Sequence, residues 1–177
     1  MNYRRIIQIA VLTLVIAMMT ASPVLAQANL PYTTDLIIGA GETAADTGDL
    51  TINYDGTVTF QVDEGAANWR LAATQLYVGD EPPVKIKPDK FPYKHEGLGG
   101  IASDVYNIDF TAADLNGDGI VYIAARAEVT TQVVHPKNGK TIIAEDTAWA
   151  QGDAVTGKGK NWMTYFSVIL VTLGPVG

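Results

Sequence analysis

The chain has 177 residues, of which 47% are hydrophobic and 18% are charged, and its formal net charge is −7. This acidic excess repels phosphate backbones and anionic lipids, so we expect neither nucleic-acid binding nor adhesion to an acidic membrane surface. The chain contains no cysteine, which excludes disulfide bonds, thiolate nucleophiles, zinc–thiolate sites and lipid-modified cysteine.

The first 26 residues have the pattern of a secretory signal peptide. Arg4 and Arg5 precede an apolar run from Ile6 to Met19, and small residues lead from there to Ala26. The apolar run is shorter than the roughly 20 residues that a membrane-spanning helix needs, so a retained anchor is the weaker alternative. We expect cleavage before Gln27, export to the cell surface or the extracellular medium, and no membrane span in the mature chain.

Residues 27–177 are predicted to form a single domain. Helical periodicity is weak there, whereas two-residue alternation and turn residues recur at short intervals, which is typical of antiparallel strands. The pattern predicts an all-β fold, an antiparallel two-sheet β-sandwich of roughly eight strands.

The clearest early unit is a β-hairpin over residues 50–62. A three-residue loop pairs Ile52 with Val58 and Leu50 with Phe60, so that apolar side chains share one face. Gly56 is then the left-handed residue of the turn.

Shorter runs predict four further strands: Leu36 to Ile38, Ala73 to Val78, Asp104 to Phe110 and Tyr165 to Thr172. The last of them is apolar on both faces, which indicates a central strand. A long loop from Gly79 to Gly100 contains four prolines. Loops of this length are usually functional or disordered.

An acidic loop matches the first half of a calcium-binding loop. Asp114, Asn116 and Asp118 offer oxygens at alternate positions, and Gly119 follows them. The twelfth position, which needs a bidentate Glu, is Ala125, so a polar turn is the favoured interpretation and the metal site the weaker one.

A second hairpin follows this turn. Alternation from Ile120 to Val133 predicts one long strand, bulged in the middle, and a four-residue loop brings Val133 opposite Ile142 and Thr131 opposite Ala144.

Catalytic candidates are few, so we expect no enzyme activity and no cofactor. The possible nucleophiles and bases of the mature chain are Ser103, Ser167, His95 and His135. Neither serine lies in a G-x-S-x-G elbow. Glu96, Glu145 and Asp146 lie near aromatic residues and leave glycoside hydrolysis as a remote alternative.

Aromatic residues beside polar groups give the candidate ligand-binding set, which comprises Tyr93, His95, Glu96, Trp149 and Trp162. Exposed rings of this kind stack on sugars while neighbouring polar groups bind the hydroxyls. The favoured alternative is that both tryptophans plug the open end of the domain.

The runs FPYKHEGLGG, VYIAARAEV and TAWAQG, followed by NWMTYFSV, resemble motifs of a family of secreted bacterial and archaeal β-sandwich modules. The resemblance extends from Asp46 to Val168 and implies the same fold, but that family has no assigned activity. This chain has Arg126 where the family often has His, and Val155 where an aromatic residue is common.

Together these features predict an exported, non-catalytic module that acts by binding or assembly at the cell exterior, with an extracellular glycan or another surface protein as partner. One alternative is a carbohydrate-binding module. Another is a filament subunit that donates residues 27–34 to a neighbour, although Pro31 makes this segment a poor strand.

Overall fold

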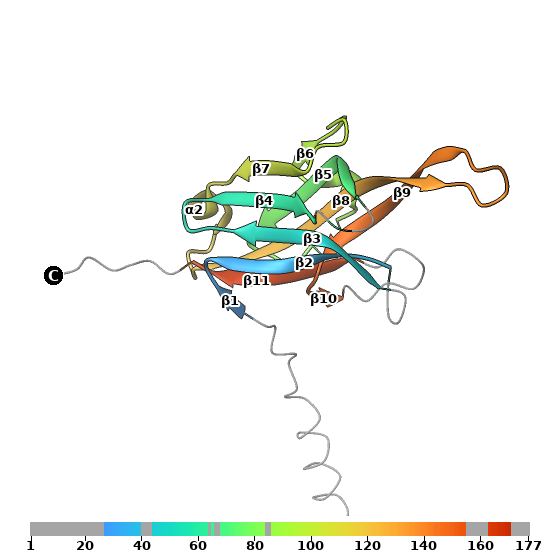
Figure 1. The fold of residues 1–177 in the computed structure, drawn as a ribbon. Helices are drawn as coiled ribbons and strands as arrows, with labels where there is room; N and C mark the ends of the chain where they lie inside the picture. The colour runs from blue at the N-terminus through green and yellow to red at the C-terminus, as the bar shows by residue number, and fades with distance from the viewer. Residues whose placement is uncertain are drawn as a thin grey trace, which may run out of the picture.

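The computed structural model describes residues 27–39, 44–63, 65, 68–83, 86–154 and 163–170 (Figure 1). The predicted signal peptide and Trp162 lie outside these residues. The described residues form β1 (Gln27–Asn29), β2 (Tyr32–Ile38), β3 (Ala45–Ile52), β4 (Thr57–Val62), β5 (Arg70–Gly79), β6 (Tyr93–His95), β7 (Ser103–Asn107), β8 (Ile120–Val134), β9 (Thr141–Ala150), β10 (Asp153–Ala154) and β11 (Thr164–Ile169), with a 3-10 turn η2 (Pro88–Lys90) and a one-turn helix α2 (Phe110–Ala113).

The strands form a single curled sheet. Antiparallel ladders connect them in the order β7, β4, β3, β2, β9, β8, β5, β6. One edge of β8 has two partners: β11 pairs with its first part, and β9 pairs with the remainder. β1 runs parallel to β11. Residues 27–29, in the segment that the filament alternative would donate, therefore pair within their own chain.

The curl brings the two ends of this order together (Figure 1). The backbone just before β7 touches both sides of the opening: Leu71 N on β5 donates to Ile101 O at 2.8 Å, and Val62 N on β4 donates to Ala102 O at 2.9 Å. The all-β, antiparallel prediction is thus confirmed. The two-sheet sandwich is not, because the strands form one nearly closed, barrel-like sheet.

The hydrophobic core follows from strand alternation. In β4 the side chains of Val58, Phe60 and Val62 are buried, whereas Thr57, Thr59 and Gln61 between them are partly exposed. The same alternation on the neighbouring strands fills the interior with a core of apolar side chains.

Both predicted hairpin registers are confirmed. Ile52 pairs with Val58 and Leu50 with Phe60, while Val133 pairs with Ile142 and Thr131 with Ala144. Registers were predictable here because a slip of one residue would turn every apolar side chain of the strand to the opposite face.

Three local predictions are wrong. The loop predicted from Gly79 to Gly100 contains the turn η2 and the strand β6. The strand predicted from Asp104 to Phe110 ends at Asn107, because the Asp109 side chain accepts a hydrogen bond from Ala112 N at 3.1 Å and caps helix α2. The bulge predicted in β8 lies in its partner strand β5, where the register shifts between Leu71 and Ala73.

Gly56 at the β3–β4 turn is predicted to be irreplaceable. Its φ is 86°, and a Cβ atom there would lie 2.2 Å from the backbone oxygen of Ile108. The left-handed conformation alone costs a non-glycine residue about 1–2 kcal/mol. We expect Gly56→Ala to lower the free energy of unfolding by more than about 2 kcal/mol in urea titrations.

Gly139→Ala is the matched control, because Gly139 has a φ of 67° and no atom within 4 Å of its added Cβ. It should show the conformational cost alone. Equal losses in the two variants would contradict the steric argument.

Candidate functional site

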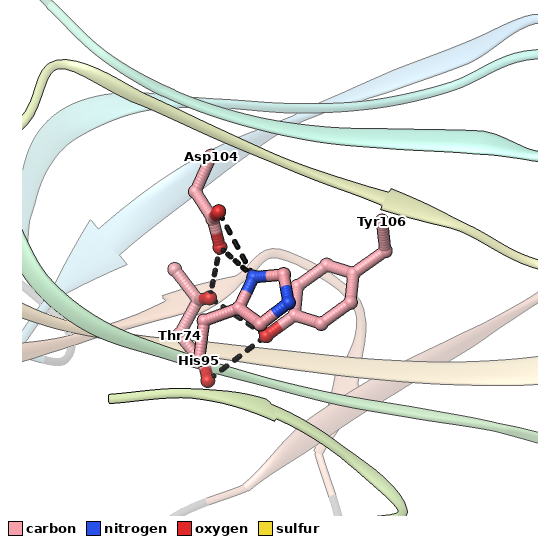
Figure 2. A network of polar contacts seen from close by, with 4 residues as sticks. All are labelled: Thr74, His95, Asp104 and Tyr106. Carbon is pink, nitrogen blue, oxygen red and sulfur yellow. Dashed lines mark hydrogen bonds and ion pairs between the residues drawn. The ribbon is translucent and has the colours of Figure 1, made fainter. Parts of the chain in front are cut away.

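A polar network joins β5, β6 and β7 where the barrel closes (Figure 2). We call Thr74, His95, Asp104 and Tyr106 the closing network. The β5–β6 register places Thr74 opposite His95. Asp104 and Tyr106 are two residues apart on β7, so they leave the strand on the same face.

Asp104 is the centre of this network. Its carboxylate oxygens both lie 2.9 Å from His95 Nδ1, and its Oδ2 accepts a hydrogen bond from the Thr74 hydroxyl. Asp104 is 8% exposed and Thr74 is fully buried, whereas the His95 side chain is 43% exposed. The network therefore ties a buried carboxylate to a histidine that reaches solvent.

Tyr106 completes the network from the core side. Its hydroxyl donates to Thr74 O at 3.0 Å and lies 2.8 Å from Thr74 Oγ1. The Tyr106 ring stacks on the His95 ring, with centroids 4.2 Å apart and planes 7° apart. The Tyr93 ring meets the Tyr106 ring edge-on, with centroids 6.3 Å apart. Burial raises the pKa of Tyr106 to about 12, so its hydroxyl stays protonated even at pH values where an exposed tyrosine ionises.

The chemistry of the closing network suits structure better than catalysis. A carboxylate on Nδ1 of a histidine leaves Nε2 available as a base, the arrangement that general-base catalysis uses. However, the two hydroxyls beside it are buried and already bonded within the network. Ser167 is only 1% exposed, which keeps its hydroxyl away from external substrates.

The four described members of the predicted ligand-binding set do not form one platform. Tyr93 and His95 lie on β6, and Glu96 follows this strand directly. Tyr93 packs against the interior core. Trp149 leaves β9 on the opposite face of the sheet, because its neighbours Ala148 and Ala150 belong to the interior core and Trp149 does not.

Trp149 is covered by the long loop before β6. Phe91 meets its ring edge-on at 6.5 Å, and Ile86, Tyr77 and Met163 pack around the same cluster. Only 7% of Trp149 is exposed. Trp149 thus stands on the outer face beneath a folded loop, rather than plugging an open end as the sequence suggested.

The acidic loop gains a partner that the sequence did not indicate. Carboxylate oxygens of Asp80, Asp114 and Asp118 lie within 4.8 Å of one another, although Asp80 is more than 30 residues away at the end of β5. Asp80 Oδ1 is buried and has no hydrogen-bond partner among the described residues. These residues could hold a cation, whereas Asn116 Oδ1 accepts from Asp118 N at 2.8 Å within the turn.

A projecting hairpin is the most distinctive surface feature (Figure 1). We call residues 130–134 of β8 and 141–147 of β9 the arm. Four large apolar side chains of the arm are exposed: Val133 (38%), Val134 (68%), Ile142 (43%) and Ile143 (68%). The sequence placed apolar residues here in the correct register but gave no sign that the sheet ends before them.

The arm is also open at its edge. β2 pairs with β9 only at residues 148–150, and in the described part of the chain no strand pairs with the outer side of residues 141–147. Open strand edges with apolar side chains are prone to associate with other chains.

Comparison with known proteins finds no matching family model, no matching characterised protein and no matching solved structure. Among the described residues, no helix is long and apolar enough to span a membrane. Any functional conclusion must therefore rest on the sequence and the geometry of this chain.

Asp104 is predicted to be essential for stability. Removing its carboxylate in Asp104→Ala leaves Thr74 and His95 without their shared acceptor, and hydrogen bonds to charged groups contribute about 1.5–3 kcal/mol each. We expect a loss of about 3 kcal/mol in urea unfolding. Asp89→Ala, which breaks an exposed contact with Lys90, is the control and should change stability by less than about 0.5 kcal/mol.

Tyr106 should make stability fall at alkaline pH. Its pKa is about 12 in the folded chain and near 10 when unfolded, so above about pH 10 the unfolded state loses a proton that the folded state keeps. The stability advantage of the wild type over Tyr106→Phe should therefore shrink by about 2 kcal/mol between about pH 9 and about pH 11.5. Urea titrations at several pH values measure it, and a constant difference would contradict the assignment.

Proposed function

We propose that this chain is an exported, non-catalytic module that acts by binding or assembly outside the cell, and that the arm is its contact surface. The observation that carries this proposal is the arm itself. Val134 and Ile143 are each 68% exposed on a hairpin that extends beyond the barrel. Exposed apolar side chains gathered on one projecting element are typical of an interaction surface.

Export rests on the sequence pattern of residues 1–26. The resemblance to secreted β-sandwich modules supports the same location, and the absence of cysteine is compatible with any redox environment.

The other functions receive less support from the geometry. A sugar platform needs exposed rings, but Trp149 is 7% exposed and packs in a different cluster from Tyr93. Catalysis needs an accessible nucleophile or acid–base pair, but the hydroxyls beside the His95–Asp104 pair are buried. Donation of the N-terminal segment would require breaking the pairing of β1 with β11.

Site-specific photo-crosslinking on intact cells tests this proposal. A photoreactive residue replaces Ile143 in the full chain, and in a matched variant it replaces Tyr54, which is 63% exposed in the β3–β4 turn at the other end of the barrel. We expect crosslinked products from position 143 and few from position 54, on protein whose N-terminus is Gln27. Equal yields at both positions, or product confined to the cytoplasm, would refute the proposal.

A further inference from the structure

We propose that two copies of the chain pair through the outer edges of their β9 strands, with Ile143 on a twofold axis. This inference rests on the proposed function and names a second copy as the partner of the arm. It follows from the backbone pattern of β9 and from the order of charges along it.

At the outer edge of β9, the backbone of the arm presents hydrogen-bonding groups that no strand of the described residues pairs with. Residues in an antiparallel ladder alternate between hydrogen-bonded and non-hydrogen-bonded pairs. His135 N donates to Lys140 O at 2.8 Å, so even-numbered residues of β9 turn their peptide groups toward β8. Gln151 N donates to Asp35 O at 2.8 Å, which confirms that odd-numbered residues face the other side. The outward-facing peptide groups in the open part of the edge are those of the odd-numbered residues Thr141, Ile143, Glu145 and Thr147.

A twofold axis at Ile143 gives this edge complementary neighbours. Ile143 then lies opposite its own copy, and Thr141 lies opposite Glu145 of the partner subunit, so outward-facing peptide groups meet each other. The non-hydrogen-bonded pair beside them places Lys140 opposite Asp146 of the partner subunit, and the symmetry repeats this pair on the other side of the axis. Opposite charges in such pairs are stabilising.

Neighbouring registers lack this match. An axis at Ile142 moves Lys140 opposite Ala144 of the partner subunit, and an axis at Glu145 sets two carboxylates against each other. Like charges directly opposite are destabilising. The sequence Lys140-Thr141-Ile142-Ile143-Ala144-Glu145-Asp146 is thus charge-complementary to itself about its central residue.

The side chains that this pairing needs are available. Lys140, Glu145 and Asp146 are exposed, and Ile143 is 68% exposed. Asp146 Oδ1 accepts a hydrogen bond from Thr147 N at 2.7 Å, which leaves its Oδ2 for a lysine. Charges on an open edge usually prevent pairing between copies, but here the symmetry converts them into two ion pairs that join the copies.

Sedimentation of the purified mature chain over a range of concentrations tests the pairing. We expect a concentration-dependent dimer below about 100 µM, as for contacts of micromolar affinity. Ile143→Lys puts two like charges on the axis. Lys140→Asp places a second carboxylate opposite Asp146 of the partner subunit. Each substitution should weaken dimerisation at least about tenfold. Val134→Lys is the control, because it introduces the same charge at equal exposure but away from this edge, and it should leave the dimer intact.

Exchanging the charges of residues 140 and 146 tests the register of the pairing. Combining Lys140→Asp with Asp146→Lys should restore the dimer, because it reverses both ion pairs without removing them. A monomer up to about 500 µM, a dimer that survives Ile143→Lys, or a swap that fails to restore pairing would each overturn the inference. If one of these results overturns the pairing and position 143 crosslinks on cells to a molecule other than this chain, the proposed function stands without it.

Discussion

The structure depends on closing a curled sheet at a place where its backbone ladder is incomplete. β5 and β7 are the strands that must meet, yet no ladder joins them among the described residues. The backbone contacts to β5 come from the segment just before β7: the bridge between Leu71 and Ile101, and the hydrogen bond from Leu98 N to Ala72 O. The side chain of Asp104 spans the gap, because it accepts hydrogen bonds from Thr74 on β5 and from His95 on β6. A buried carboxylate is costly unless it is fully bonded, so this network favours one specific closure over many alternatives.

The closure also gives the most conspicuous polar residues a structural role. His95 and Tyr93 belong to the predicted ligand-binding set, and the Tyr106 ring lies against both of them. In the same way, the proline-containing loop before β6 is a cover for the outer face of the sheet, where Phe91 packs on Trp149. Aromatic side chains that look available in the sequence are used to seal both faces of the barrel wall.

Once those residues are accounted for, the arm stands apart from the rest of the chain. Its base is fixed by the barrel, since Val129 and Ala148 are fully buried where β8 and β9 leave it. Its outer part buries little, so its apolar side chains contribute little to the stability of the fold. An element that extends a strand pair into solvent with exposed isoleucine and valine is suited to contacting another molecule.

The sequence by itself determined the class of the fold, the two hairpin registers and the left-handed turn at Gly56, because alternation and turn chemistry act between residues close in the chain. The single curled sheet, the position of Trp149 and the joining of His95 to Asp104 were decided by tertiary structure. These features depend on which face of a strand meets which distant segment, and two-residue alternation does not specify that. Asp80 shows the same limit: its place beside Asp114 follows from the path of β5 against β8, and no local pattern in the sequence indicates it.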